Sequence, residues 1–327
     1  MKIIPFILTN FERPFYLNKL VTSLIDMGIN DIHIIDNGSN IKNDLFLIKN
    51  TRIIKKKENT GGSAGMNFLF KNLIKNDQHD QFNLILDDDL ILDSEYKKNF
   101  ALIINFILTF QKKFILLSRR VNRAEWENQI NFGHMNFDIP NSVFNWFWLK
   151  SILYKMIKKK PVNYDLGRVS LCECDKGHFG GMIIPTNLVD KIIMPSSELY
   201  LYADDHRFTR NNYNQNNIPL YQTSILKIFD QDLNDKKNKK KKYKLNSAFN
   251  PDTDIESLKY QIRNHFFESL KLKSKSRIFN TNLIFWFVLN SWACLIQTKN
   301  IIFVIKRILF IYKCMKEGQK LKNLIRN

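Results

Sequence analysis

The first 90 residues alternate short apolar runs with helix-forming segments, and each apolar run ends in a cluster of polar side chains. The runs KIIPFILTN (2–10) and DIHIIDNGSN (31–40) are typical of strands, and residues 14–27 between them are typical of a helix. Because parallel strands need a crossover connection, strand, helix and strand in this order indicate a parallel sheet. The pattern therefore predicts an α/β fold.

Two further apolar runs extend the same pattern. TRIIKKKEN (51–59) predicts a third strand and FNLILDDD (82–89) a fourth, and Gly61, Gly62 and Gly65 open a helix between them. In open α/β sheets, ligands bind outside the carboxyl ends of the strands. We therefore expect the polar clusters to converge on one cleft.

The fourth run stops on three adjacent carboxylates, Asp87, Asp88 and Asp89. Neighbouring like charges raise one another's pKa unless a cation joins them. Asp87 and Asp89 are hard oxygen ligands, expected on one face of the strand with Asp88 pointing the other way, and such donors suit Mg²⁺ or Mn²⁺ that also holds phosphate oxygens. The alternative is a solvated acidic turn.

Three other segments have both a functional and a structural interpretation. The NTGGSAG loop could cradle phosphate with backbone amides at a helix N-terminus, although it matches neither common phosphate-loop pattern; the alternative is an ordinary glycine-rich turn. Asp204 and Asp205 precede a predicted helix and suit either a catalytic base or a helix cap. His178 is either a substrate contact or a histidine with its hydrogen bonds satisfied inside the protein.

Seven motifs in order across residues 3–264 resemble a family 2 glycosyltransferase of the GT-A fold, in its galactofuranosyltransferase-like and rhamnosyltransferase-like branches. The motifs are ILTNFERP, IIDNGSN, ENTGGSAGMN, LILDDDL, HFGGMIIP, LYLYADDHRF and YQIRN. The resemblance implies a mixed, mainly parallel sheet flanked by helices. It also implies a metal-dependent transferase that moves galactofuranose, rhamnose or another hexose from a UDP- or dTDP-linked donor. The acceptor would be a glycan or a lipid-linked glycan of a bacterial surface polysaccharide such as capsule or lipopolysaccharide.

The resemblance also implies roles for individual residues. Thr9 and Asp36 would lie near the nucleotide base, Arg13 near the ribose or the phosphates, and Asp88 would face the sugar nucleotide. Asp205, next to Asp204, would be the catalytic base. We expect the remaining substrate-binding positions in the glycine-rich loop, the His-Phe-Gly-Gly turn and the last motif: Asn59, Gly61, Gly62, His178, Phe179, Gly180, Gly181 and Arg263.

By the same resemblance, Asp87 and Asp89 would hold Mn²⁺ or Mg²⁺ on the diphosphate. Family members commonly supply a further metal-binding His two dozen residues after the second acidic pair, where this chain has Asp230 in LKIFDQD. We hypothesise that Asp230 replaces the imidazole, because Asp is also a hard oxygen ligand. One base opposite one leaving group further implies inversion at the anomeric carbon, by analogy with inverting glycosidases.

The chain has 50 Lys and Arg against 31 Asp and Glu, a formal charge of +19, which favours a polyanionic neighbour. Much of the excess follows residue 236. We predict a catalytic domain at 1–234, a Lys-rich linker at 235–250 and a basic, apolar helical region at 251–327. Its apolar run 283–295 is shorter than the roughly 20 residues of a membrane span, so a helix lying in an anionic membrane surface fits better. The alternative is a helix that packs in the core or between subunits.

Two other functional classes fit less of the sequence. Haloacid-dehalogenase-like phosphatases also end a strand in Asp-x-Asp, but their motif continues differently and lies nearer the N-terminus. A nucleic-acid-binding protein would use the positive charge, yet the basic excess is not interleaved with a stacking platform.

Cysteine usage bears on the cellular setting. Cys172 and Cys174 form a C-x-C pair without a second pair at zinc-ligand spacing, and the chain opens without a signal segment. We expect a reducing, cytoplasmic setting at the inner face of the bacterial membrane.

Overall fold

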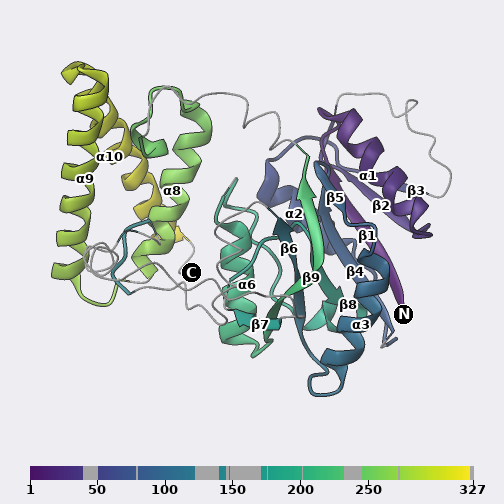
Figure 1. Ribbon diagram of the computed structural model, residues 1–327. Coiled ribbons are helices and arrows are strands. Elements are labelled where there is room, and N and C mark those ends of the chain that lie inside the picture. Colours follow the sequence, from purple (N-terminus) through teal and green to yellow (C-terminus); the bar gives the residue numbers. More distant parts are fainter. Residues whose placement is uncertain are drawn as a thin grey trace. The chain divides into compact units, whose positions relative to one another are not determined.

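The protein is described by a computed structural model, shown in Figure 1, which divides into two compact units. The described residues are 1–39, 51–78, 80–121, 140–144, 147, 171–174, 176–200, 202–231, 245–271 and 273–324. The sheet unit comprises Met1–Met135, Tyr164–Tyr200 and Asp204–Asn238. The helical unit comprises Asn136–Asn163, Leu201–Ala203 and Lys239–Asn327.

One mixed sheet forms the centre of the sheet unit, in the order β3-β2-β1-β4-β8-β6-β9-β5, with β7 also pairing with β9. Among the described strands, six run in one direction: β1 (Lys2–Thr9), β2 (Ile32–Asp36), β3 (Thr51–Lys55), β4 (Gln81–Asp87), β6 (Ile115–Val121) and β9 (Leu220–Asp230). Three run in the other: β5 (Leu90–Leu92), β7 (Leu171–Cys174) and β8 (Met182–Pro185). The predicted α/β class and mixed, mainly parallel sheet are confirmed.

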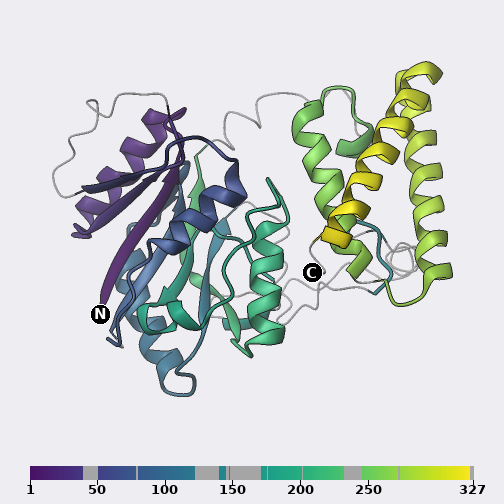
Figure 2. The same cartoon turned by 180° about the vertical axis from the view of Figure 1, so that it is seen from behind.

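Helices cover both faces of this sheet (Figures 1 and 2). They are α1 (Pro14–Asp26) and α3 (Tyr96–Leu108) on one face, and α2 (Gly62–Lys71) and α6 (Asp204–Gln215) with the 3₁₀ helix η2 (Thr186–Lys191) on the other. Leu84 of β4 packs into the first core and Ile85 into the second. A strand that is buried on both faces needs apolar residues at successive positions, which explains the continuous apolar run of β4.

The parallel register brings the functional candidates of several strands to one edge. Thr9 pairs with Asp36 across β1 and β2, and Leu8 pairs with Asp87 across β1 and β4. On the far side of the antiparallel strand β8, β6 and β9 run parallel, so that their carboxyl ends reach the same edge.

The helical unit is built from α8 (Ile255–Lys271), α9 (Ser276–Thr298), α10 (Ile301–Leu324) and the 3₁₀ helix η3 (Ser247–Phe249). α10 packs against both α8 and α9. The hydrophobic core of the helical unit includes Phe249, Trp286 and Ile311. Helical structure in this region agrees with the sequence pattern.

One expectation for the helical unit needs correction. The apolar run 283–295 was expected to be too short to cross a bilayer, but it lies inside α9, a helix of 23 residues. By length and composition alone, α9 is the one helix among the described residues that could cross a membrane. The apolar run is shorter than its helix because polar residues such as Asn280 and Thr298 are also helical.

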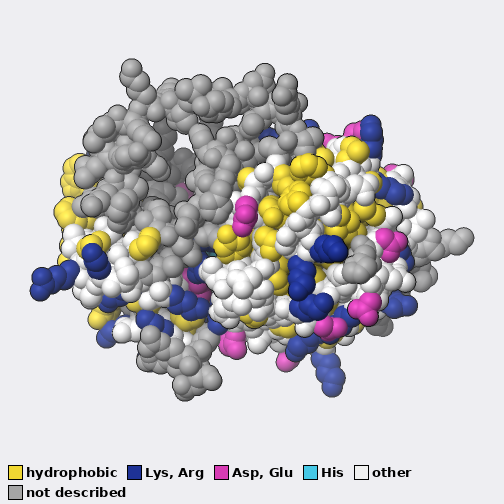
Figure 3. Space-filling view, turned by 90° about the horizontal axis from the view of Figure 1, so that it is seen from below, with side chains coloured by type: hydrophobic (Ala, Val, Ile, Leu, Met, Phe, Trp, Pro, Cys, Tyr) yellow, Lys and Arg dark blue, Asp and Glu magenta, His cyan; other side chains and the backbone are white. Residues whose placement is uncertain are grey.

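Exposed hydrophobic side chains also occur on the sheet unit. Seen from below, hydrophobic side chains gather on the surface among Lys and Arg side chains (Figure 3). On and just beyond α3, Leu102, Phe106 and Phe110 are each more than half exposed. The rings of Phe106 and Phe110 are in contact, so these three side chains form a short apolar stripe along α3.

Candidate active site

The acidic turn and Asp230 lie together because of how β5 pairs. β4 ends at Asp87, the chain turns through Asp88 and Asp89, and β5 then pairs antiparallel with the end of β9, where Leu90 lies opposite Asp230. The backbone N–H of Gln231 donates to the Asp89 carbonyl oxygen at 2.8 Å. Carboxylates far apart in the sequence thus share one edge of the sheet.

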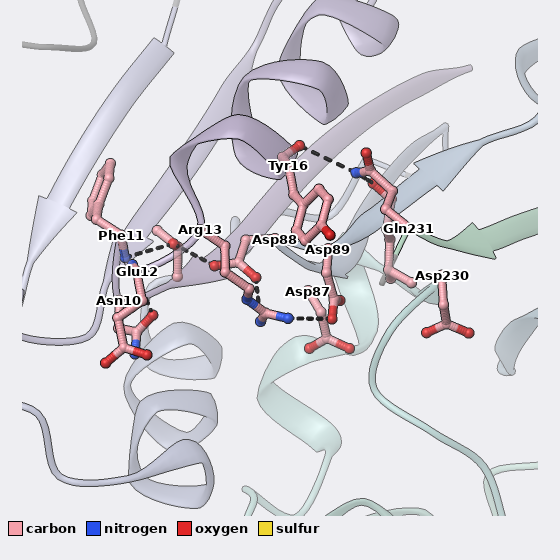
Figure 4. A network of polar contacts seen from close by, with 12 residues as sticks. Asn10, Phe11, Glu12, Arg13, Tyr16, Asp87, Asp88, Asp89, Asp230 and Gln231 are labelled. Atoms are coloured by element: carbon pink, nitrogen blue, oxygen red, sulfur yellow. Dashed lines mark hydrogen bonds and ion pairs between the residues drawn. The ribbon is translucent and has the colours of Figure 1, made fainter. Parts of the chain in front are cut away.

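Arg13, just before α1, binds two carboxylates of the acidic turn (Figure 4). Its Nη2 lies 2.6 Å from Asp88 Oδ1 and its Nη1 lies 2.5 Å from Asp89 Oδ2. The second oxygen of Asp88 accepts a hydrogen bond of 2.7 Å from the Thr9 hydroxyl. Asp88 is therefore buried, with both oxygens engaged by the end of β1 and the start of α1.

This arrangement corrects the expected orientation of the three carboxylates. Alternation along a strand would turn Asp88 away from Asp89, but β4 ends at Asp87 and the next two residues form a turn. Strand alternation no longer applies there. Asp88 and Asp89 consequently face the same guanidinium group, that of Arg13.

Arg120 of β6 is a functional candidate that the sequence patterns did not single out. Its Nη2 forms an ion pair with Asp230 Oδ1, and its Nη1 lies 3.7 Å from Asp87 Oδ2. A register shift between Leu117 and Arg119 in the pairing of β6 with β9 precedes it. Arg120 therefore links the first carboxylate of the acidic turn to Asp230. A basic residue at the carboxyl end of a strand was the signal available in the sequence.

Burial dominates the electrostatics of the acidic turn. It raises the pKa of Asp87 to about 6, opposed by Arg120 and reinforced by Asp89 and Asp230. It also raises the pKa of Asp88 to about 6, opposed by Arg13 and by the hydrogen bond from Thr9. Four carboxylates against two arginines leave an excess of negative charge, which favours a further cation.

The donor chemistry of the site fits a divalent cation that arrives with a substrate. Asp87 and Asp89 offer oxygen ligands, and Gly180 keeps the space beside Asp87 open, since a Cβ there would lie 2.7 Å from Asp87 Oδ2. Within the described ranges, no three His, Cys, Asp or Glu side chains are grouped as a metal site. Mg²⁺ is commonly held by one or two carboxylates plus substrate phosphates. Two carboxylates beside a diphosphate satisfy that requirement.

The His-Phe-Gly-Gly turn touches both the acidic turn and α6. Gly180 adjoins Asp87, and the Phe179 ring packs against Phe208 of α6. Just before the turn, the backbone N–H of Gly177 donates to the Thr209 hydroxyl on α6 at 3.1 Å. Gly181 has a φ of +86° and the Cβ of any other residue would lie 2.5 Å from Ile228, so glycine is required there. Its carbonyl accepts a 2.7 Å hydrogen bond from the Ser118 hydroxyl.

The side chains of this turn face the protein interior. His178 is buried, and its Nδ1 donates to the Gly180 carbonyl at 2.5 Å. Burial lowers the pKa of His178 to about 3, and Arg120 acts in the same direction, so the ring is neutral. Phe179 is buried between Phe70 and Phe208. Phe179 thus packs in the core, and only its backbone is available to a ligand.

Asp204 and Asp205 form the first turn of α6. Burial, and then the charge of Asp205, raise the pKa of Asp204 to about 7. Asp205 Oδ1 accepts a 2.7 Å hydrogen bond from the backbone N–H of His206. The pair combines a helix-terminal position, which favours negative charge, with one carboxyl whose pKa is raised by burial.

Close packing accounts for the glycine-rich loop. Asn59 Oδ1 accepts from the Gly61 N–H at 3.0 Å, and the Tyr200 carbonyl accepts from the Ser63 N–H at 3.2 Å. Gly61 has a φ of +87°, and a Cβ there would lie 2.5 Å from the Tyr200 ring; Gly62 begins α2. Two amides that a phosphate would need are already engaged, which favours the structural interpretation of the loop.

Asp36 stabilises the turn after β2. Its two oxygens accept 2.8 Å hydrogen bonds from the backbone N–H and the hydroxyl of Ser39, and Lys55 Nζ lies 3.6 Å away. The side chain is fully buried. Asp36 therefore lies at the expected edge of the sheet with much of its hydrogen-bonding capacity used by its own loop.

Arg263 belongs to the helical unit. Its guanidinium stacks 4.9 Å from the Tyr260 ring, and its Nε donates to Asn264 Oδ1 at 2.8 Å. Asn264 Nδ2 in turn donates to the Tyr202 carbonyl at 3.1 Å. The Tyr-x-x-Arg-Asn motif thus forms an internal cluster that holds the segment immediately before Asp204.

No protein-family model and no curated protein sequence matches the chain. Among solved structures, TarS residues 1–349 from S. aureus aligns over 100% of this chain and 91% of that chain, with 16% identity and a TM-score of 0.44. GalNAc-T7, crystallised with UDP, GalNAc and Mn²⁺, aligns over 70% of this chain and 44% of that chain, with 11% identity and a TM-score of 0.48. At these values neither likeness carries an argument about substrate or activity.

Proposed function

We propose that this protein is a glycosyltransferase that moves a sugar from a nucleoside-diphosphate donor to a hydroxyl group of an acceptor. The observation that carries the proposal is the cluster of Asp87, Asp88, Asp89 and Asp230 with Arg13 and Arg120 at the carboxyl edge of a mixed sheet. This edge is where open α/β sheets bind nucleotides. The order of the seven sequence motifs supports the same reaction.

The donor diphosphate would bind against the acidic turn. Asp87 and Asp89 would hold Mn²⁺ or Mg²⁺, which when bound supplies Lewis-acid neutralisation of the departing diphosphate. Arg13 fixes the direction of Asp89 through a contact of 2.5 Å. Arg120 pairs with Asp230. Because Asp87, Asp89 and Asp230 are not grouped as a metal site among the described residues, Asp230 would become the proposed third oxygen ligand only by leaving Arg120 when the donor binds.

The acceptor hydroxyl would lose its proton to Asp205. A carboxylate at the N-terminus of α6 is stabilised in its ionised form by the helix dipole. Burial and the charge of Asp205 raise the pKa of Asp204, so the two carboxyls titrate as a coupled pair that holds a proton more readily than an exposed carboxylate does. A single base opposite a single leaving group supports inversion at the anomeric carbon.

The proposed identities of the donor, the acceptor and the product rest on the sequence resemblance. We propose a UDP- or dTDP-linked donor carrying galactofuranose, rhamnose or another hexose, and a glycan or lipid-linked acceptor. The product would belong to a bacterial surface polysaccharide such as capsule or lipopolysaccharide. Synthesis would take place in the cytoplasm at the inner face of the cell membrane.

A donor panel tests this proposal. The purified protein is incubated with UDP-, dTDP- and GDP-linked sugars and Mn²⁺, with water as the acceptor of the sugar. The release of nucleoside diphosphate is followed, and the anomeric configuration of the sugar first released is read by NMR. We expect release from one donor class, lost in Asp87→Asn and retained in Glu95→Gln, whose side chain is exposed on the surface. Release of inorganic phosphate from simple phosphate esters would instead support the phosphatase interpretation.

A further inference from the structure

α9 and α10 expose more large apolar side chains than α3 does. Six of these side chains, between 43% and 64% exposed, are Phe285, Val288 and Trp292 on α9 and Ile302, Ile305 and Leu309 on α10. Steps of three and four residues place each set on one side of its helix. We call these six residues the apolar face.

The opposite sides of the same helices already form a core. Trp286 and Cys294 of α9 and Ile311 and Cys314 of α10 are buried in it. A surface helix of a globular protein normally buries one apolar side and exposes polar side chains on the other. α9 and α10 are apolar on both sides, so the exposed side needs a second apolar partner.

The charges around the apolar face indicate which kind of surface it binds. Residues 269–316 contain nine Lys and Arg and no Asp or Glu. Of these cations, Arg277, Lys299, Lys306 and Lys313 are exposed. A second copy of the chain would place like charges against each other. An anionic lipid surface complements both the cations and the apolar side chains.

We propose that the apolar face docks on an anionic lipid bilayer, with its side chains at the acyl boundary and the surrounding lysines at the lipid phosphates. This inference rests on the exposed face and its charges, independently of the proposed sugar transfer.

Contacts along α9 favour a helix lying in the interface over one that crosses the bilayer. Asn282 near its start donates to the Asn141 carbonyl at 2.9 Å, and the Cys294 thiol near its end contacts the Phe249 carbonyl at 3.4 Å. Both ends of the helix are therefore held by polar groups of the same unit. A crossing α9 would have to take these groups into hydrocarbon, where each needs a partner.

Vesicle flotation of the full chain tests the proposal, with vesicles of phosphatidylcholine alone and of phosphatidylcholine with phosphatidylglycerol. We expect binding to the anionic vesicles, weakened by high salt. The double variant Val288→Ser, Trp292→Ser should lower partitioning by about tenfold or more, because it removes two apolar anchors. The matched control Leu102→Ser, Phe106→Ser removes two side chains of similar exposure from α3 and should bind like the unmodified chain.

Several outcomes would overturn the docking proposal. One is that the unmodified chain fails to float with anionic vesicles, and another is an equal loss of binding in the α3 control. A dimer that dissociates in the Val288→Ser, Trp292→Ser variant, without vesicle binding, would assign the face to a second copy. Resistance to extraction at alkaline pH would indicate a crossing helix in place of an interfacial one.

The Val288→Ser, Trp292→Ser variant tests lipid docking separately from the proposed sugar transfer. The substitutions lie in the helical unit, at exposed positions, so nucleotide binding by calorimetry should be unchanged. Loss of vesicle binding with intact nucleotide binding supports docking. A chain that floats with anionic vesicles but binds no nucleotide would support docking while removing the proposed transfer.

Discussion

Arg120 on β6 forms an ion pair with Asp230 at the end of β9. The Arg120 side chain is only 13% exposed and that of Asp230 is fully buried, so this ion pair lies away from solvent. The same guanidinium reaches Asp87 at 3.7 Å. Arg120 thus connects the two halves of the sheet at the edge where the candidate site lies.

We expect replacement of Arg120 to destabilise the fold. Arg120→Leu would remove a buried guanidinium from Asp230, which costs roughly 3 kcal/mol of unfolding free energy by analogy with other broken buried pairs. Denaturant titration measures this. The control is Lys98→Leu, whose partner Glu95 is exposed and whose loss should cost less than about 1 kcal/mol. If Arg120→Leu and Lys98→Leu lowered the unfolding free energy by equally small amounts, the ion pair of Arg120 with Asp230 would not stabilise the fold.

Asp230 has a second proposed role, that of a metal ligand. Asp230→Ala should weaken Mn²⁺ binding in the presence of nucleotide by about tenfold, a typical loss when one interaction at a metal site is removed. Calorimetric titration of Mn²⁺ provides the measurement, with Glu95→Ala as an exposed control. Unchanged Mn²⁺ affinity in a folded Asp230→Ala protein would limit Asp230 to anchoring Arg120.

The raised pKa of Asp204 predicts a pH-dependent effect on stability. With a folded pKa of about 7 and an ordinary value of 3.8, the folded state holds its proton more tightly than the unfolded state between these pH values. Stability contributed by this group is therefore lost as pH rises from about 4 to 7.

Asp204→Asn removes that titration. The variant should gain thermal stability relative to the unmodified protein at pH 8, and the gain should shrink towards pH 4. Thermal unfolding at several pH values checks this, with Asp190→Asn, whose side chain is 70% exposed, as the control. A gain that does not depend on pH would contradict the assigned pKa.

Asp205 should be needed for turnover more than for donor binding. As the proposed base, its replacement in Asp205→Asn should lower kcat by roughly 10²–10⁴-fold, the usual range for general base catalysis. Nucleotide affinity should stay within about twofold, since the carboxylate acts on the acceptor. Steady-state kinetics and calorimetry together measure both. Loss of nucleotide binding with kcat preserved would assign Asp205 to the donor instead.

Local periodicity was sufficient to predict much of the sheet unit. β1, α1, β2 and β4 each follow from an apolar pattern that depends only on neighbouring residues. The convergence of Thr9, Asp36 and the acidic turn on one edge also follows, because parallel strands align their carboxyl ends. These predictions needed no knowledge of distant contacts.

The features that the sequence did not predict depend on contacts between residues far apart in the chain. Arg120 gains its role because β6 lies beside β9 after the antiparallel insertion of β8, and no local pattern reveals that order. The orientation of Asp88 depended on where β4 stops. Phe179 resembles a substrate contact in the motif, yet it packs against Phe70 of α2 and Phe208 of α6.

The most direct test of a sugar-nucleotide site is calorimetric binding of UDP, dTDP and GDP, with and without Mn²⁺. The unmodified protein is compared with the Asp87→Ala, Asp89→Ala variant. We predict that one nucleotide binds only with Mn²⁺ and that the variant, still folded, loses this binding. If none of the three nucleotides binds in a metal-dependent way, the carboxylate cluster is not a nucleotide-sugar site and the proposed transferase function is wrong.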